Sequence, residues 1–328
     1  MRIQFLFLAL VIASCFAGVH AQALKFRKDG TFRIVQFTDI HYDASSPTSR
    51  PSLKVMEETL DAEKPDLVVF TGDVVTRSPN KKGWDDVLQV AISRRIPYVV
   101  TFGNHDDEGD LKREALAEYV VSKPYLVNKV ARIPGVSGYL NAAITIEGTN
   151  GKPGAIIYAM DSHAYTAHPR VKGYGWFMHD QVSWFRNTSA SFVEAHKDTL
   201  PALAFFHIPL PEYKLAFDDL GNRRIGVRYE KECPPDINTG MFTAMLEAGD
   251  VMGMFVGHDH TNDYLVDYYD IALAYGACTR GGESYKRSKS GARIIELTQG
   301  KRQFHTYIRE LDGQKIYPVD FPFPKPKK

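Results

Sequence analysis

Short apolar runs rich in β-branched residues alternate with helix-like stretches between residue 32 and about residue 260. The apolar runs are residues 32–37, 67–70, 98–102, 143–146, 155–160, 202–206, 251–256, 271–275 and 293–297. Amphipathic spacing predicts helices over residues 52–63, 85–94, 111–121 and 179–196. Beyond residue 260 helical spacing is absent and short strands dominate. Continuous apolar strands separated by helices are typical of sheets covered on both faces, which predicts an α/β fold.

Five of these strands are followed directly by side chains that can bind a metal ion. In chain order these side chains are Asp39 and His41, Asp73, Asn104, His207, and His258 and His260. Ligands bind at the carboxyl ends of the strands in open α/β sheets, so these side chains are expected to meet at one edge. A single Gly-Asp pair is usually a turn, and a single His is usually structural. The ordered set, with a strand before every member, predicts a metal site.

The residue types and their spacing support this interpretation. Two Asp, one Asn and four His offer hard oxygen and borderline nitrogen donors, which suit Zn, Fe or Mn better than Ca or Mg. Two residues separated by one position, such as His258 and His260, can face the same side of an extended segment. Glycines precede Asp73, Asn104 and His258, and glycine permits tight turns and close backbone approach.

The segments that carry these residues are FTDIHY, TGDVVT, FGNHDDEG, HIPLPEY and VGHDHTNDY. Together they resemble the signature blocks of the calcineurin-like metallophosphoesterases, and within these the short purple-acid-phosphatase-like group. The matching stretches span roughly residues 32–300, which is nearly the whole chain after its first segment. The resemblance implies a four-layer α/β/β/α sandwich with two central mixed sheets.

The resemblance also implies a role for each site residue. It implies one metal ion held by Asp39, His41 and His260, and a second held by Asn104, His207 and His258, with Asp73 bridging the two. His105 matches the proton-donating histidine of the family. Asp106 follows it and has two interpretations. It is either a catalytic residue that orients His105 or a ligand, or a residue of a surface turn.

One position departs from the purple acid phosphatases. Those enzymes carry a metal-bound tyrosine three residues after the bridging Asp, and Thr76 occupies that position here. Because threonine has no phenolate, we do not expect the purple iron-to-tyrosine colour. The metal pair therefore stays open between Fe/Zn, Mn/Mn and Zn/Zn.

The resemblance implies hydrolysis of phosphate esters. Two cations about 3.5–4 Å apart polarise phosphoryl oxygens and activate a water for in-line attack on phosphorus, while His105 protonates the leaving oxygen. We expect a phosphomonoesterase acting on a small phosphorylated substrate. A phosphodiesterase for nucleotides or lipid head groups is the alternative. A non-catalytic metal-binding protein is disfavoured, because a structural site has no use for a proton donor.

Three further residues are candidate substrate contacts. Tyr42 follows His41, Tyr213 lies shortly after His207, and His163 sits at the end of the strand predicted over residues 155–160. A tyrosine at a strand end more often serves packing. Packing therefore remains the alternative for both tyrosines.

The beginning of the chain is typical of a signal peptide. Arg2 precedes an apolar run that extends to Val19, and small residues suited to cleavage follow it. We therefore expect residues 1–22 to direct export to a periplasmic or extracellular space. Cys15 closes a segment that resembles a bacterial lipoprotein box, so a lipid anchor is the alternative to free export. No later segment approaches the roughly 20 apolar residues of a membrane span. We assign residues 23–316 to one metallophosphoesterase domain and residues 317–328 to a Pro- and Lys-rich tail.

The charge balance bears on possible binding partners, and the cysteine content bears on disulfide formation. The chain has 40 Lys and Arg against 39 Asp and Glu, and this balance gives no electrostatic reason to expect binding to a nucleic acid scaffold. Cys233 and Cys278 remain after removal of residues 1–22. In an oxidising compartment they either form a disulfide or stay as two unpaired thiols.

Overall fold

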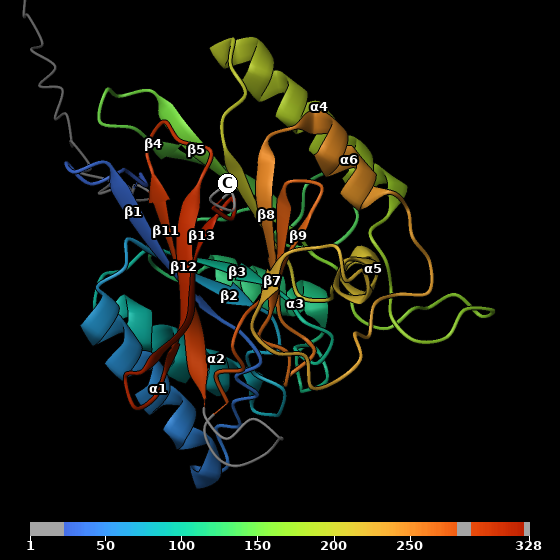
Figure 1. Cartoon of the computed structure of the whole chain (residues 1–328). Coiled ribbons are helices and arrows are strands. Elements are labelled where there is room, and N and C mark those ends of the chain that lie inside the picture. Colours follow the sequence, from blue (N-terminus) through green and yellow to red (C-terminus); the bar gives the residue numbers. More distant parts are fainter. Residues whose placement is uncertain (1–22, 281–289, 325–328) are drawn as a thin grey trace, which may run out of the picture.

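The computed structural model describes residues 23–280 and 290–324 (Figure 1). The expected signal peptide, including Cys15, lies outside these residues. The strands are β1 (Thr31–Phe37), β2 (Leu67–Thr71), β3 (Tyr98–Thr101), β4 (Ala142–Glu147), β5 (Pro153–Ala159), β6 (Ala202–Phe205), β7 (Arg224–Ile225), β8 (Val251–Val256), β9 (Leu265–Tyr268), β10 (Ile271–Tyr275), β11 (Gly291–Thr298), β12 (Phe304–Glu310) and β13 (Lys315–Phe321). The helices are the 3-10 turn η1 (Pro47–Ser49) and α1 (Arg50–Glu63), α2 (Asn80–Ile92), α3 (Arg113–Val121), α4 (His179–His196), α5 (Glu212–Asp218) and α6 (Met241–Ala248).

The strands form two mixed sheets. The first has the order β13-β12-β11-β1-β2-β3, and the second has the order β4-β5-β6-β8-β10-β9-β7. In the first sheet β1, β2 and β3 are parallel to one another. In the second sheet β5, β6, β8 and β10 are parallel. The carboxyl ends of each parallel set therefore share one edge of its sheet.

Three apolar cores hold the layers together. One core lies between the two sheets, where Ile34 of β1 packs in the same cluster as Phe205 of β6. A second core joins the first sheet to α1, α2 and α3, and it includes Val35 of β1. The third core joins the second sheet to α4, α5 and α6. Neighbours such as Ile34 and Val35 face opposite cores because successive strand side chains alternate between the faces of the sheet. Both faces of the strands are thus covered, which explains their continuous apolar sequences.

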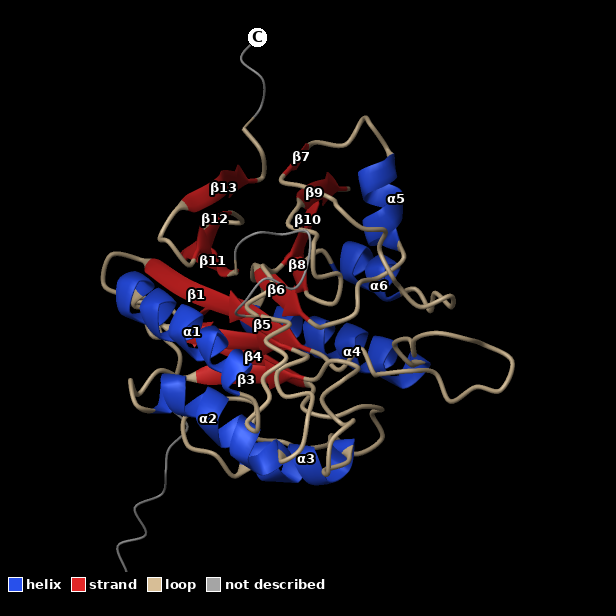
Figure 2. Cartoon of the chain, turned by 90° about the horizontal axis from the view of Figure 1, so that it is seen from below, coloured by secondary structure: helices blue, strands red, loops and turns tan. Residues whose placement is uncertain are grey.

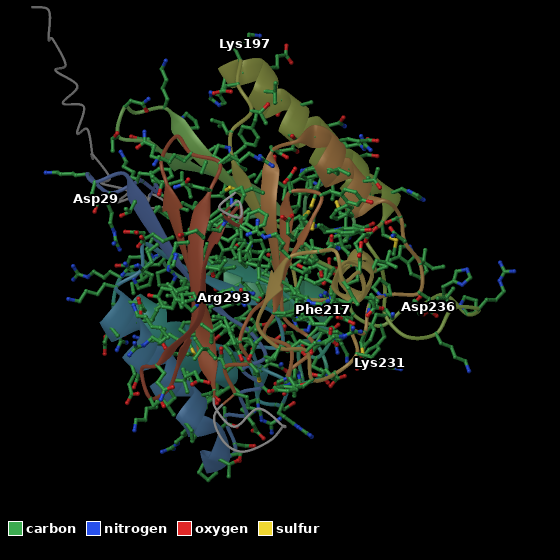
Figure 3. All side chains as sticks on the ribbon, in the orientation of Figure 1. Asp29, Lys197, Phe217, Lys231, Asp236 and Arg293 are labelled. Carbon is green, nitrogen blue, oxygen red and sulfur yellow. The ribbon has the colours of Figure 1, made fainter. Side chains whose placement is uncertain are left out.

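Figure 2 shows the two helical layers on either side of the sheets, and the predicted four-layer α/β/β/α sandwich is confirmed. Figure 3 shows Arg293 of β11 in the interior, while Asp29 and Lys197 lie at the periphery. The Arg293 guanidinium donates from Nε to the Tyr275 carbonyl oxygen of β10 at 2.5 Å. Because β11 and β10 belong to different sheets, this hydrogen bond links the two central layers.

Several details of the fold differ from the sequence interpretation or lie outside it. β13 crosses the expected boundary at residue 316, so the first residues of the predicted tail are a strand of the first sheet. The described residues contain no helix long and apolar enough to cross a membrane. Cys233 is exposed and Cys278 is buried, and no disulfide bond joins these two described residues. Of the two alternatives for these cysteines, the structure supports the one with two thiols, although only Cys278 is buried.

Candidate metal centre

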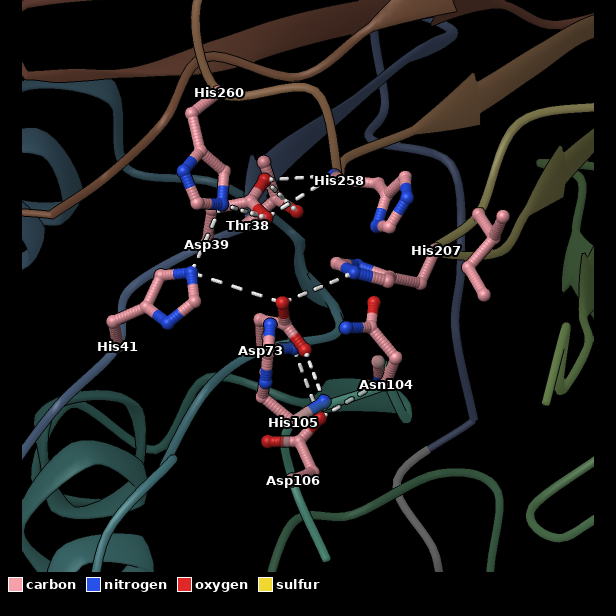
Figure 4. Close-up of polar contacts among 12 residues, drawn as sticks. Thr38, Asp39, His41, Asp73, Asn104, His105, Asp106, His207, His258 and His260 are labelled. Carbon is pink, nitrogen blue, oxygen red and sulfur yellow. Dashed lines mark hydrogen bonds and ion pairs between the residues drawn. The ribbon is translucent and has the colours of Figure 1, made fainter. Parts of the chain in front are cut away.

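The ends of β1, β2 and β3 meet the ends of β6 and β8 at one place, where the seven predicted ligands converge (Figure 4). The first group consists of Asp39, His41, Asp73 and His260, each of which offers one ligand atom within 4.8 Å of the others. The His41 and His260 Nε2 atoms are 3.0 Å apart. The His260 Nε2 lies 3.3 Å from Asp39 Oδ1. Convergence of two ring nitrogens and two carboxylates is typical of a transition-metal site.

The second group is marked by buried polar atoms that have no hydrogen-bond partner. These atoms are Asn104 Oδ1, His207 Nε2 and His258 Nε2. The other His207 nitrogen, Nδ1, lies 2.7 Å from the Thr71 carbonyl oxygen. A carbonyl can only accept a hydrogen bond, so Nδ1 carries a hydrogen and Nε2 is the nitrogen left to bind a cation. Buried polar groups are rarely left unpaired in proteins, and these three atoms fit a second metal ion.

Asp73 lies between the two groups. Its Oδ2 is 3.7 Å from His41 Nε2 in the first group and 3.3 Å from His207 Nε2 in the second. Its other oxygen, Oδ1, accepts a hydrogen bond from the His105 backbone N–H at 2.8 Å. This placement is the one expected of a carboxylate shared by two metal ions.

Electrostatics divide the imidazoles of the site into two kinds. Burial lowers the pKa of His41 to about 4 and that of His258 to about 3, so both rings are neutral near pH 7. Burial alone would raise the pKa of Asp39, but the His260 ring outweighs it and lowers the pKa to about 2. Burial alone would lower the pKa of His207, but the Asp73 carboxylate outweighs it and raises the pKa to about 9. Because neutral imidazoles and ionised carboxylates are the species that coordinate a cation, His207 must release a proton when a metal ion binds.

The backbone at the site is strained. Asp39, His41, Asp73 and His258 have positive φ angles of 52°, 46°, 50° and 78°. Side chains other than glycine rarely adopt this left-handed region, and such strain clusters at functional sites. The turns that follow β1, β2 and β8 therefore hold these four side chains in directions that an ordinary turn does not favour.

Asp106 holds together the turns that follow β2 and β3. Its buried carboxylate accepts four backbone N–H groups, from Gly103 at 2.7 Å, Val74 at 2.8 Å, Asp73 at 2.9 Å and Val75 at 3.1 Å. Burial together with the Asp73 charge raises the pKa of Asp106 to about 6, so it is ionised at neutral pH. Asp106 is fully buried, which excludes the surface-turn interpretation. It positions the turns that carry Asp73 and Asn104 and does not enter the cleft.

Two glycines allow the turns to approach one another. A Cβ on Gly103 would lie 2.2 Å from Asp73 Oδ1, and a Cβ on Gly257 would lie 1.9 Å from Thr38 Oγ1. Both distances are far shorter than a van der Waals contact. The expected close approach at these positions is therefore present in the fold.

Comparison with known proteins agrees with this geometry. Residues 32–262 match the family described as calcineurin-like phosphoesterase. This segment is more than half of the chain and includes all seven predicted ligands.

The chain belongs to the calcineurin-like phosphoesterase family.

Individual relatives place the chain near the purple-acid-phosphatase-like members of this family. The chain is 33% identical to probable inactive purple acid phosphatase 14 of Arabidopsis thaliana, over 84% of this chain and 78% of the relative. It is 31% identical to phosphatase DCR2 of Saccharomyces cerevisiae, over 92% of this chain and 57% of the relative. A solved dimetal phosphatase from Danio rerio superposes with a TM-score of 0.62 at 13% identity, covering 89% of this chain and 99% of that one. The predicted resemblance is confirmed.

A cleft of about 910 Å³ opens beside the first group of ligands. His41 and His260 line it, and so does His105, whose Nδ1 lies 2.8 Å from Glu108 Oε2. The remaining wall is polar and consists of Asp43, Ser45, Ser46, Thr48, Ser49, Thr76, Arg77, Ser78, Glu108, Gly109 and Arg280. Thr76 thus lies in the cleft at the position where purple acid phosphatases carry their tyrosine. His105 has the location expected of a residue that meets a substrate.

The structure places the three tentative substrate contacts elsewhere. The Tyr213 hydroxyl donates to the Met254 carbonyl oxygen at 2.9 Å, and the ring is buried in the core beneath α5 and α6. The Tyr42 hydroxyl donates to Asp86 at 3.1 Å, with its ring in the core beneath α1 and α2. Both tyrosines follow the packing alternative. The His163 Nε2 lies 2.7 Å from Gln181 Oε1 and points toward α4.

Sequence reasoning missed three residues beside the metal centre. Glu108 contacts His105, as described above. The Tyr165 ring lies 6.1 Å from the His105 ring, and the Tyr174 ring lies 4.4 Å from the His258 ring, between centroids. The two tyrosines follow no predicted strand directly. Their only sequence signal is that they come shortly after Asp161, at the carboxyl end of β5.

Proposed function

We propose that the protein is an exported, metal-dependent phosphomonoesterase that acts on small phosphate esters. One observation carries the proposal. Asp73 is shared by two groups of metal-capable atoms, and the first of these groups borders a polar cleft that His105 also lines. Asp39, His41 and His260 would hold one ion together with Asp73. Asn104, His207 and His258 would hold the other. When bound, such ions polarise phosphoryl oxygens and lower the pKa of water so that it can attack phosphorus.

The chain itself supplies the proton for the leaving group. The contact of His105 Nδ1 with Glu108 Oε2 at 2.8 Å fixes the orientation of the ring and leaves Nε2 available to the cleft. A proton on Nε2 can be transferred to the ester oxygen as the bond to phosphorus breaks. Arg77 and Arg280 line the same cleft and attract an anionic substrate.

The test uses protein stripped of metal and then reloaded separately with Zn, Mn or Fe. Hydrolysis of nitrophenyl phosphate is compared with that of bis-nitrophenyl phosphate, and bound metal is measured by elemental analysis. We expect activity only after reloading, about two ions per chain and faster turnover of the monoester. Because Thr76 cannot supply a phenolate, we also expect no strong visible absorption band.

Each of the other possible results would favour a different function or metal content. Faster turnover of the diester would favour the phosphodiesterase alternative. Binding of two ions without hydrolysis of either ester would indicate a non-catalytic metal-binding protein. One ion or none in active protein would overturn the two-metal assignment.

Export is a separate part of the proposal and rests on residues 1–22 alone. Its support is the basic start, the apolar run and the small residues at the end of this segment. Expression of the full chain followed by amino-terminal sequencing of protein outside the cytoplasm tests it. Recovery of the uncleaved chain inside the cell would contradict export, and a lipid on Cys15 would indicate the anchored form.

A further inference from the structure

Residues 164–175 form a hairpin-like excursion beside the metal centre. The Thr166 N–H donates to the Gly173 carbonyl oxygen at 3.0 Å, and the Gly175 N–H donates to the Ala164 carbonyl oxygen at 2.7 Å. The excursion projects from the body of the molecule and is the yellow-green loop at the right of Figure 1. Tyr165 and Tyr174 face each other across its base, with ring centroids 5.5 Å apart and an interplanar angle of 22°.

The base of this excursion is fixed to the second sheet. The His163 N–H donates to Asp161 Oδ1 at 2.9 Å, and the His163 ring contacts Gln181 of α4. Asp161 is itself buried and paired with Arg113, whose Nη2 lies 2.6 Å from its Oδ1. The two tyrosines are therefore held on a rigid support, which a residue needs in order to contribute to specificity.

The tyrosine pair adjoins both the second ligand group and the proton donor. The Tyr174 ring meets the His258 ring edge to face, with centroids 4.4 Å apart and an interplanar angle of 87°. The Tyr165 ring lies at 76° to the His105 ring. The Tyr165 hydroxyl also accepts a long hydrogen bond from Asn104 Nδ2 at 3.4 Å. The pair thus forms a wall next to the point where the leaving group must be protonated.

Tyr165 is 51% exposed, so much of its surface is available to contact a ligand. An exposed aromatic ring beside a proton donor has an evident use. The leaving oxygen must come within about 3 Å of His105 to receive its proton. The first carbon atoms of the alcohol then lie within reach of a ring whose centre is 6.1 Å from that of His105. Stacked and edge-to-face aromatic pairs prefer centroid separations of about 4.5–7 Å, so an aromatic alcohol fits this space.

We propose that Tyr165, supported by Tyr174, contacts the alcohol part of the substrate and selects esters with an aromatic ring next to the ester oxygen. This inference rests on the proposed phosphomonoesterase function and adds a substrate class to it. Tyr165 lies next to the His105 ring, whereas the cleft that His105 lines is bordered mainly by polar side chains such as those of Ser78 and Arg77.

The experiment compares benzyl phosphate with cyclohexylmethyl phosphate on metal-loaded protein. Both have primary alkoxide leaving groups of similar bulk, and they differ in the aromaticity of the ring. Binding of benzylphosphonate and cyclohexylmethylphosphonate, which are not hydrolysed, is measured in parallel by calorimetry. Three variants are used. Tyr165→Leu removes the ring, Tyr165→Phe removes only the hydroxyl, and Tyr269→Leu is the control. Tyr269 is 65% exposed and lies in the turn between β9 and β10, at the end of the sheet away from the site.

We expect the unmodified protein to prefer the benzyl compounds by about 3- to 10-fold, both in kcat/KM and in phosphonate affinity, which is the range given by aromatic pairing. Tyr165→Leu should abolish the preference, whereas Tyr165→Phe and Tyr269→Leu should retain it. Metal content should be equal in all variants.

Other outcomes overturn the inference. These are equal affinity for the two phosphonates, or a preference that survives in Tyr165→Leu. If Tyr165→Phe loses metal, or if its affinity for both phosphonates falls by the same factor, Tyr165 serves to orient Asn104 instead of selecting the aromatic ring. If benzylphosphonate binds more tightly than cyclohexylmethylphosphonate but no ester is hydrolysed, the role of Tyr165 is supported and the phosphomonoesterase function is refuted. Failure of this inference can therefore be told apart from failure of the proposed function.

Discussion

The Asp106 carboxylate offers the sharpest test of how this metal centre is assembled. Each of its oxygens accepts two backbone N–H groups. Oδ1 accepts from Val74 and Val75, and Oδ2 accepts from Asp73 and Gly103. In Asp106→Asn one oxygen becomes an NH₂ group, which then faces two N–H donors without accepting from them. We therefore predict that this nearly isosteric change loosens both turns.

The expected loss in the free energy of unfolding follows from the number of backbone N–H groups that lose their acceptor. A buried N–H without a partner costs about 1–3 kcal/mol, and two such groups cost about 2–6 kcal/mol. The amide is also easier to bury than the carboxylate, which offsets part of the loss. We expect the free energy of unfolding to fall by about 2–4 kcal/mol. Because the turns carry Asp73 and Asn104, metal affinity should fall at both sites.

The assay is urea unfolding of metal-free protein at pH 8, followed by metal competition with a chelating dye. The matched control is Asp107→Asn, since the neighbouring Asp107 side chain is 25% exposed and lies 3.6 Å from Arg113. A long, partly exposed contact of this kind is worth about 0–1 kcal/mol. If Asp106→Asn unfolded within about 0.5 kcal/mol of the unmodified protein and bound both ions normally, the four hydrogen bonds would not have the structural role assigned to them.

Three further substitutions test other parts of the centre. Asp73→Asn should reduce metal content at both positions, as measured by elemental analysis, because Asp73 is shared; normal content would refute the bridge. His105→Ala should keep both ions, whereas the exposed control His196→Ala should change nothing. In His105→Ala, kcat for alkyl esters should fall by about 10²–10⁴-fold and kcat for nitrophenyl esters by less; equal losses would indicate substrate positioning. Burial would raise the pKa of Asp161, but Arg113 outweighs it and lowers the pKa. The Asp161–Arg113 pair therefore stabilises the fold above the unfolded-state pKa of about 4, and this contribution is lost as pH falls through the lower folded-state value. In urea unfolding the deficit of Asp161→Asn should be constant above about pH 5 and shrink in acid, and a deficit that grew in acid would contradict this assignment.

The nine predicted strands were visible in the sequence because each has apolar residues on both of its covered faces. The missed strands lack this signal. β12 has the sequence FHTYIRE and β13 has KIYPVDF, in which polar and apolar residues mix, and β13 is the edge strand of the first sheet. β7 has only two residues. α6 was missed because MFTAMLEA has only eight residues, which gives little more than two turns in which a helical period can be recognised.

The convergence of the seven candidate ligands was predictable because each depends on a local arrangement, a strand followed by a short turn. Partners that depend on the tertiary fold were not. Nothing in the sequence near Tyr165 shows that it meets His105, since the two lie in loops that follow strands of different sheets, β5 and β3. Tyr213 is the opposite case. Its position shortly after His207 predicted a substrate contact, but in the folded chain α5 places its ring in the apolar core. The two interpretations of Asp106 could be separated only by its burial.

The design of the centre argues for catalysis over a purely structural metal site. Left-handed backbone at positions such as Asp73 costs about 1–3 kcal/mol each, and the buried His258 Nε2, which has no hydrogen-bond partner, costs free energy as well. A folded chain tolerates such a concentration of unfavourable terms when bound cations offset them, and a structural metal site would do this equally well. A structural site, however, is closed by protein ligands on every side. Here His41, His260 and His105 line an open polar cleft, and His105 stands beside the ligands without joining them. An open cleft and a histidine that stands beside the ligands without joining them have no purpose in a structural site, so this arrangement favours the proposed hydrolysis over purely structural metal binding.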